Sequence, residues 1–496
     1  VPAQALRLGP AGVTHTQVLA SAHALQNDGR LQQADKTVLD GMTTKRALAL
    51  EKEVITKIEQ GRGVVPPCFT KSHVSAALDR AEKDASVGIK LDEKQRDAAM
   101  QMLTSMDRYT GIQGSAGVGK TTMLRAVRVA ARNEEFIGLA AQHDAAQVLQ
   151  KEAGIPSRTL ESLIGSIERE VQREGPGLAN MKAFYANKTL VVDESSMKSN
   201  AQMVRLMRAM EAVNVKRAVF VGDQRQLGSP EAGAPFRHAL MENLNHAVMD
   251  NIRRQKDPVL LEAVKHLAKG EVSPALRLVQ PHITALGRDT PEAAYAKAAH
   301  DAWAAGRANE REPRIIVPTN ALRGAVAVEI RKTLIESKEL GEGGDHAALR
   351  PDRMATAEKH RAENYQEGHV LVFHQGLRAS GIKRDAHLTV VGRDLRNNLL
   401  ITENRAGQRH QVDLNTVAAS RNSYFETYLS KTIEVREGER LVWDRIYQQK
   451  DPTTGELAKD FKVGSRFTVE KIEGDRWTVR DEQDQRHVLH KDNPAL

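Results

Sequence analysis

A glycine-rich stretch followed by a lysine and two threonines has the composition of a phosphate site. Residues 111–122 read GIQGSAGVGKTT, between a short apolar run and a helical pattern. Glycines in this context allow a tight turn whose backbone N–H groups point at an anion, and the start of the next helix adds partial positive charge. The predicted nucleotide-binding residues of this loop are Gly114, Gly117, Gly119, Lys120, Thr121 and Thr122.

Two adjacent acids supply chemistry that a bound nucleotide would need. Asp193 and Glu194 end the apolar run TLVVDE. A carboxylate such as Asp193 can hold Mg²⁺ through water, the Thr121 hydroxyl can ligate the same ion, and Glu194 can polarise an attacking water. Lys120 should reach the β and γ phosphates. Adjacent acids after such a run favour an ATP-hydrolysing motor over a GTPase switch, so we expect ATP and Mg²⁺ as cofactors.

Two glutamines are candidates for reading the nucleotide. Gln226 follows the run RAVFVGD and lies just beyond Asp223, where it could sense the γ phosphate. Gln95 starts a helical pattern upstream of the loop, and its amide offers a donor and an acceptor that match the two edges of adenine. An ordinary surface glutamine is the alternative interpretation of Gln95.

Alternating strands and helices must position these residues. From about residue 91, short apolar runs end in small or polar residues and are mostly separated by helical stretches; the runs are RYTGIQ, EFIGLAAQ, TLVVDE, RAVFVGD and PRIIVPT. This pattern is typical of an α/β fold with a parallel sheet covered by helices on both faces. Ligands bind at the carboxyl ends of the strands in such sheets. The polar residues that end these runs are therefore the expected site.

The two ends of the chain have different patterns. Residues 1–85 combine helical patterns with LQQADKTVLDG, which alternates like two short strands, so we predict a winged-helix-like domain and a linker. After about residue 365 the chain is rich in β patterns and repeats itself. Residues 387–412 resemble residues 466–489, and both contain Gln-Arg-His. We predict two small SH3-like barrels there.

Composition limits the class of protein. The 496 residues should form several domains, and no apolar run is long enough to span a membrane. The single cysteine, Cys68, excludes an internal disulfide and fits a reducing cytoplasm, where we expect a packed or loop thiol. A net charge of +8 is compatible with a polyanionic partner, and also with an ordinary solvated surface.

The motifs taken together resemble one family. Gln95, the loop, Asp193-Glu194 and GDQRQL (222–227) occur in the order of superfamily 1 helicases, and NIRRQ (251–255) follows them. With DESSM, GIPSRTLESL and EAGAPFR, the sequence resembles the helicase half of conjugative relaxase–helicases of the TraI/TrwC type, which are related to RecD. The resemblance covers nearly the whole chain, including the β-rich end.

The resemblance implies a motor that moves 5′ to 3′ on single-stranded DNA. It makes Glu194 the catalytic acid, lets Gln226 couple the γ phosphate to DNA, and brings Arg254 to the γ phosphate. Thr159 lies in a motif that contacts the DNA strand. His143 lies in the first DNA-contacting motif, where this chain has AQHD instead of the family's usual Pro-Thr.

The family also implies a domain order. We expect a RecA-like motor domain 1A at 86–250 with a short 1B insert near 165–188, the start of a second RecA-like domain 2A at 251–345, and an inserted 2B region with both barrels at 346–496. The nicking half and the last two motor motifs of the family are not found. We therefore expect a piece of a longer protein that binds ATP and DNA but is incomplete for unwinding.

The expected partners follow from the same resemblance. They are single-stranded DNA, the relaxase domain of the same parent chain and the coupling protein of a type IV secretion system. We expect a monomer in the bacterial cytoplasm that is exported to a recipient cell during conjugation. The alternative is a non-catalytic module that carries the translocation signal for that secretion system. Another P-loop ATPase, such as a clamp loader, finds no support in Gln95 and GDQRQL.

Overall fold

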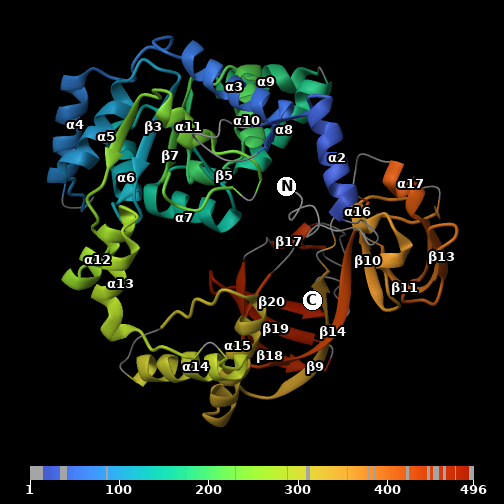
Figure 1. The fold of residues 1–496 in the computed structure, drawn as a ribbon. Coiled ribbons are helices and arrows are strands. Elements are labelled where there is room, and N and C mark those ends of the chain that lie inside the picture. The colour runs from blue at the N-terminus through green and yellow to red at the C-terminus, as the bar shows by residue number, and fades with distance from the viewer. Residues whose placement is uncertain are drawn as a thin grey trace. The chain divides into compact units, whose positions relative to one another are not determined.

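A six-stranded sheet in which all neighbouring strands run parallel is the main element of residues 22–284 in this computed structural model (Figure 1). The strand order is β5-β4-β6-β7-β3-β8. The strands are β3 (Tyr109–Gly114), β4 (Glu135–Ala140), β5 (Ser157–Thr159), β6 (Lys188–Val192), β7 (Arg217–Gly222) and β8 (His246–Met249). The predicted α/β fold with a parallel sheet is confirmed.

The structure describes most of the chain. The described residues are 15–33, 42–84, 88–173, 175–229, 231–287, 289–308, 313–352, 354, 356–377, 380–384, 386–419, 424–443, 447–450, 457–461, 465–474 and 476–490. They divide into two units, each described by itself below. Residues 22–284 are called the sheet unit, and residues 285–496 with residues 1–21 are called the antiparallel unit.

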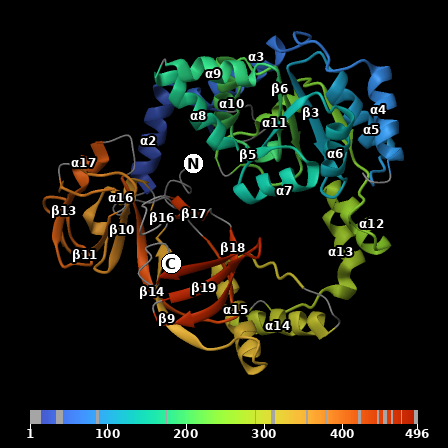
Figure 2. The same ribbon diagram turned by 180° about the vertical axis from the view of Figure 1, so that it is seen from behind.

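Helices cover both faces of the parallel sheet (Figures 1 and 2). Every residue of β3, β6 and β7 is buried, as expected where both faces of a parallel sheet are covered. Successive residues of β7 enter different cores: Phe220 packs in one, and Val219 and Val221 pack in the other. The first core contains residues of α3 (Lys45–Gln60), α8 (Leu160–Arg173), α10 (Asn200–Ala212) and α11 (Pro235–Met241). The second contains residues of α4 (Lys71–Lys83), α5 (Glu93–Thr104), α6 (Lys120–Ala130) and α7 (His143–Ala153).

Helix α3 belongs to the sheet unit although it lies in the predicted N-terminal domain. Thr44 is its N-cap and accepts a hydrogen bond from the N–H of Ala47. Its buried face contributes Val54 and Ile58 to the first core. Before it, α2 (His15–Asn27) is followed by the antiparallel pair β1 (Leu31–Gln33) and β2 (Met42–Thr44). Of the two strands predicted within LQQADKTVLDG (31–41), β1 lies in the first, whereas the turn and the second predicted strand lie outside the described residues and β2 follows them.

Four helices follow the parallel sheet. They are α12 (Pro258–Ala268), α13 (Val272–Val279), α14 (Glu292–Ala308) and α15 (Asn320–Glu336). The expectation that PRIIVPT forms a strand is wrong, because none of its residues is in a strand. The side chain of Ile316 is 95% exposed, and within the described residues no strand pairs with this segment, so its backbone has no ladder to join.

The described residues of the antiparallel unit form three sheets. The largest has the order β13-β12-β11-β10-β14-β9, the second β15-β18-β19-β20, and the third is the pair β16-β17. Their strands are β9 (Gly343–Pro351), β10 (His369–Phe373), β11 (His387–Asp394), β12 (Leu399–Glu403), β13 (Arg409–Asp413), β14 (Phe425–Arg436), β15 (Arg440–Val442), β16 (Tyr447–Lys450), β17 (Leu457–Phe461), β18 (Arg466–Glu473), β19 (Arg476–Asp481) and β20 (Arg486–His490). The predicted β-rich end is confirmed.

The two larger sheets share an irregularity at matching places in the repeat. The ladder between β11 and β12 shifts register between Val390 and Gly392, and the ladder between β18 and β19 shifts between Val469 and Lys471. These positions align in the segments HLTVVG and RFTVEK. Because a β-bulge bends and twists a strand, the same bulge gives both sheets the same local shape. The predicted repeat is confirmed in strand order and in this bulge.

Besides α14 and α15, the described part of the antiparallel unit contains the short helices α16 (Thr356–Lys359) and α17 (Leu414–Ala419). Within the part of the chain that the structure describes, no helix is both long and apolar enough to cross a lipid bilayer.

Candidate nucleotide-binding site

The loop between β3 and α6 has a backbone that requires glycine at two places. Gly117 and Gly119 have φ angles of 81° and 80°, in the left-handed region that side chains disfavour. A Cβ on Gly119 would lie 2.4 Å from the amide nitrogen of Gln95, and one on Gly117 would lie 2.9 Å from the Cβ of Arg254. The first N–H groups of α6 have no intrahelical acceptor, so this end of the helix can receive an anion.

Lys120 lies between the loop and a group of acids. Its ammonium group donates to the carbonyl oxygen of Gly114 at 2.7 Å. Burial lowers the pKa of Lys120, and the charges of Asp193, Asp223 and Glu194 act in the opposite direction. A lysine held by carbonyl oxygens can exchange them for phosphate oxygens. The loop and the lysine therefore fit a nucleotide polyphosphate.

Asp193 and Glu194 follow the end of β6, as expected. Burial raises the pKa of the Asp193 carboxyl group, and the N–H of Glu194, which donates to Asp193 Oδ1 at 2.9 Å, lowers it. Glu194 has a φ of 50° and an exposed side chain. Left-handed backbone at a non-glycine residue is strained and is concentrated at functional sites. The described residues contain no cluster of three His, Cys, Asp or Glu side chains for a metal, so Mg²⁺ here would need phosphate oxygens as further ligands.

Arg254 lies at the loop because the chain around it is docked there. The backbone N–H groups of Arg253 and Arg254 both donate to the carbonyl oxygen of Gly117, at 2.9 and 3.0 Å. The Arg253 side chain forms an ion pair of 3.1 Å with Asp92 and donates to the carbonyl oxygen of Lys90. The loop, the start of α5 and the segment before α12 thus form one connected cluster.

Gln95 is buried against the loop, so the surface interpretation is wrong. Its side chain is 1% exposed. Its amide oxygen accepts from the N–H of Asp92 at 3.0 Å, which completes a capping box, and its amide nitrogen donates to the carbonyl oxygen of Val118 at 2.9 Å. Both amide atoms would have to exchange partners to bind adenine. That role stays a prediction.

The predicted DNA-contacting residues also lie at the carboxyl ends of the parallel strands, but at different strands of the sheet. His143 begins α7 just after β4, and Thr159 ends β5, whose partner across the ladder is Ala140 at the end of β4. The Thr159 hydroxyl accepts from the N–H of Ser162 at 3.3 Å. Two strands, β6 and β7, separate β4 from the strand that leads into the phosphate loop. The structure therefore groups the nucleotide residues and sets these two apart.

Sequence reasoning missed two residues of this cluster, Gln113 and Arg253. Gln113 lies inside the buried strand β3, and its amide nitrogen donates to Asp223 Oδ1 at 3.0 Å. A polar residue in a buried run must find partners, so its position in the apolar run RYTGIQ was the available signal. Nothing in the local sequence indicates that Arg253 pairs with Asp92.

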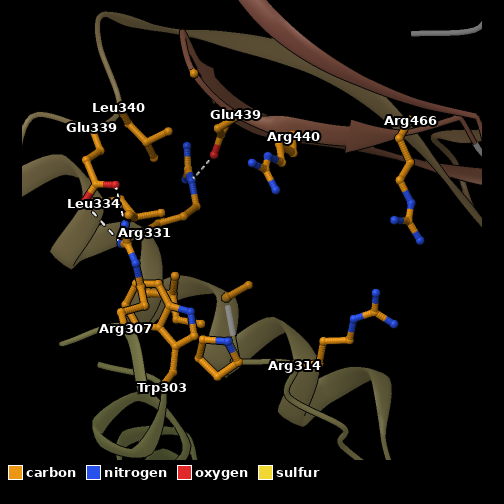
Figure 3. A pocket seen from close by; sticks show the side chains of 14 residues that line it. Trp303, Arg307, Arg314, Arg331, Leu334, Glu339, Leu340, Glu439, Arg440 and Arg466 are labelled. Atoms are coloured by element: carbon orange, nitrogen blue, oxygen red, sulfur yellow. Dashed lines mark hydrogen bonds and ion pairs between the residues drawn. The ribbon is translucent and has the colours of Figure 1, made fainter. Parts of the chain in front are cut away.

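A pocket in the antiparallel unit is lined by arginines but by none of the predicted site residues. Its volume is about 710 Å³, and it lies among α14, α15 and the turn before β15 (Figure 3). Arg307 pairs with Glu339 and packs over the Trp303 ring, while Arg331 pairs with Glu439. These pairs neutralise two of its arginines. The predicted nucleotide-binding and catalytic residues gather at the phosphate loop instead, so the loop is the candidate site.

The comparisons with known proteins agree with the motifs. Residues 90–284 match the family described as "AAA domain". The conjugal transfer protein TraA of Rhizobium radiobacter is 30% identical over 360 residues, which are 71% of this chain and 29% of TraA. The multifunctional conjugation protein TraI of Escherichia coli K12 is 26% identical over 501 residues, which are 90% of this chain and 26% of TraI. The chain is a relative of the conjugal transfer proteins TraA and TraI.

The resemblance inferred from the motifs is thereby confirmed, and the chain spans less than a third of the length of these relatives. The AAA match covers every predicted nucleotide-binding residue, from Gln95 to Arg254. Among solved structures, a Pif1 helicase of Bacteroides in complex with ADP-AlF4 is 15% identical with a TM-score of 0.33, over 76% of this chain and 80% of that one. Pif1 of Candida albicans gives a TM-score of 0.34 at 15% identity, over 77% and 83%.

Proposed function

We propose that this chain is the motor segment of a conjugative DNA-transfer protein and uses ATP to move 5′ to 3′ along single-stranded DNA. The observation that carries the proposal is the cluster at the phosphate loop. There, Lys120, the acids that follow β6 and the backbone of Arg254 surround one glycine turn. The names of the relatives support the place of the motor in conjugation.

Each residue of the cluster has a definite task in this proposal. Lys120 releases the carbonyl oxygen of Gly114 and binds phosphate oxygens in its place. Thr121 and Asp193 would hold Mg²⁺, which neutralises phosphate charge when bound. Glu194 accepts a proton from the attacking water, and Arg254 stabilises the charge that develops on the transferred phosphoryl group.

The test of nucleotide binding is calorimetry with ADP and with a non-hydrolysable ATP analogue in the presence of Mg²⁺. Lys120→Ala should weaken both affinities by about tenfold or more, because it removes a charge-assisted phosphate contact. Lys151→Ala, at an exposed position on α7, should leave them unchanged. Equal affinities in the wild type and Lys120→Ala would contradict the site.

The test of DNA binding is a titration of a labelled single strand at several salt concentrations. Backbone contacts release counterions, so affinity should fall steeply as salt rises. His143→Ala and Thr159→Ala should weaken binding while nucleotide affinity stays unchanged, because the two sites occupy different strand ends. Affinity that does not depend on salt, or preference for a defined duplex site, would argue against a translocating motor.

The nucleotide cluster favours a motor over the alternative of a module that only carries a translocation signal. A signal module has no use for a lysine, two acids and an arginine around a phosphate loop. The proposal has three further parts. The chain binds the relaxase domain of a parent chain, it binds a secretion coupling protein, and it is a monomer. Sedimentation of the chain with and without DNA tests the monomer directly.

A further inference from the structure

A glutamine at the end of β3 joins the phosphate loop to the turn that carries Gln226. Gln113 directly precedes Gly114 and is 7% exposed. Its amide nitrogen donates to Asp223 Oδ1 at 3.0 Å, and its amide oxygen accepts from the N–H of Gln224 at 3.0 Å. Both ends of one buried amide therefore hold the same turn.

The turn is built around Asp223. The side chain of Asp223 is 5% exposed, and its Oδ1 also accepts from the N–H of Arg225 at 3.1 Å. Its carbonyl oxygen accepts from the N–H of Gln226 at 3.0 Å, which closes the turn. These hydrogen bonds therefore fix both the orientation of the Asp223 carboxylate and the backbone path from Asp223 to Gln226.

The other side of Gln113 leads to the lysine of the loop. The next residue, Gly114, gives its carbonyl oxygen to the Lys120 ammonium group at 2.7 Å. The Asp223 charge also raises the pKa of Lys120 against the effect of burial. A displacement of Gln113 would therefore shift both the phosphate loop and the turn 223–226.

Packing alone does not explain a glutamine here. The strand is buried along its whole length, so an apolar side chain of the same length would fill the space without burying polar atoms. The position needs a donor that faces a carboxylate and an acceptor that faces a backbone N–H. An amide supplies both at once, whereas a carboxylate supplies only acceptors.

We propose that Gln113 is a positioning residue that acts through Gln226. It fixes the turn 223–226 against the phosphate loop, so that the presence of the γ phosphate and the position of this turn depend on each other. The inference rests on the proposed function and on the role predicted for Gln226 from the sequence, which is to sense the γ phosphate.

The first test is Gln113→Met, which removes both hydrogen bonds and adds no charge. Calorimetry with Mg²⁺ gives the affinities for ADP and for a non-hydrolysable ATP analogue. The ratio of these affinities should fall by about tenfold, while the ADP affinity should change by less than about twofold, because in this proposal Gln226 senses only the γ phosphate, which ADP lacks. A merely structural role would lower both affinities together and leave the ratio unchanged.

The second test exchanges the two groups. Gln113→Glu places a carboxylate against Asp223 and should also lose the preference for the analogue. Adding Asp223→Asn places an amide donor opposite the new carboxylate, but the same atom then faces the N–H of Arg225, which loses its acceptor, so the double variant should regain part of the ratio. Gln224→Glu is the matched control, since it makes the same charge change on an exposed side chain of the same turn and should keep the wild-type ratio.

The outcomes separate this inference from the proposed function. A wild-type ratio in Gln113→Met, no preference in the wild type, or a double variant that behaves like Gln113→Glu would overturn the role of Gln113. If Lys120→Ala still abolishes binding in that case, the nucleotide site stands and only the positioning role is lost. If Gln113→Met does not fold, as judged by circular dichroism, the exchange experiment decides alone.

Discussion

Gly119 has the least freedom of the loop residues to accept a side chain. Its φ of 80° and the 2.4 Å separation of a built Cβ from Gln95 mean that Gly119→Ala must strain the backbone or displace Gln95. We expect a loss of nucleotide affinity of about tenfold or more, since left-handed alanine costs roughly 1–2 kcal/mol before any clash. Fluorescent-nucleotide titration measures it.

Gly165→Ala is the matched control for this variant. Gly165 lies inside α8, where the nearest atom to a built Cβ is in Arg169 at 4.0 Å. Alanine stabilises a helix interior by roughly 0.5–1 kcal/mol relative to glycine, so nucleotide affinity should be unchanged and the melting temperature slightly higher. Equal effects of the two substitutions on affinity would show that the loop conformation is not needed.

Cys68 offers a second test at the residue scale. Burial raises the pKa of its thiol to about 11, and the charge of Arg217 opposes this only in part. Only the thiolate attacks disulfide reagents. At pH 8 we expect the folded chain to react with an aromatic disulfide about a hundredfold more slowly than the chain in urea, because an unfolded thiol titrates near 8.5. Similar rates in both states would contradict the raised thiol pKa that this half-buried position produces.

At the scale of elements, Arg331 joins α15 to the turn between β14 and β15. It extends from α15 to pair with Glu439, and it donates to the carbonyl oxygen of Glu434 at 3.0 Å. The Glu439 side chain is 13% exposed, so Arg331→Ala would leave a buried carboxylate without this partner. We expect a loss of roughly 1–3 kcal/mol in unfolding free energy by urea titration.

Lys332→Ala, on the next residue of α15, tests the same helix without that contact. Lys332 pairs with Glu329 across one helical turn, and its side chain is 60% exposed. Exposed pairs contribute little, so its effect should stay within about 0.5 kcal/mol. If both variants unfold at the same urea concentration, Arg331 does not hold α15 to the turn between β14 and β15.

The sequence predicts the elements whose signal is local. The apolar runs that became β3, β4, β6 and β7 are fully or mostly buried, and their length makes them readable without a partner. The edge strands β5 and β8 have three and four residues, too few for a clear period. The run at 313–317 has the composition of a strand but finds no ladder within the described residues, and composition cannot reveal that.

The candidate site likewise contains residues that the sequence reveals and residues that only the folded chain reveals. The loop, the acids after β6 and Gln226 are recognisable because each motif is contiguous in sequence. The contact of Gln113 with Asp223 joins residues 110 positions apart, and it exists only because β7 lies beside β3 in the sheet. Pairing of Arg253 with Asp92 likewise needs the folded chain. Local sequence patterns do not reveal such contacts, because they depend on how distant segments pack in the folded chain.

At the scale of the molecule, the predicted nucleotide residues all lie in the sheet unit. That unit has two hydrophobic cores of its own, and α3 contributes Val54 and Ile58 to the first of them. We therefore expect residues 42–284 to fold alone and to bind ADP within about twofold of the affinity of the full chain. Calorimetry on the two proteins measures this. A folded fragment that binds much more weakly would mean that the antiparallel unit contributes to the site.

Strand β14 has a consequence for the order in which the chain is made. Its first residues pair with β10 and the rest with β9, and its ends supply Phe425 to one core and Val435 to another. A ribosome that has just completed β10 at Phe373 must add some fifty residues before β14 begins at Phe425. At 5–20 residues per second this takes roughly three to ten seconds. During that time β9 and β10 are complete but lack β14 as a neighbour, so each has an unpaired edge.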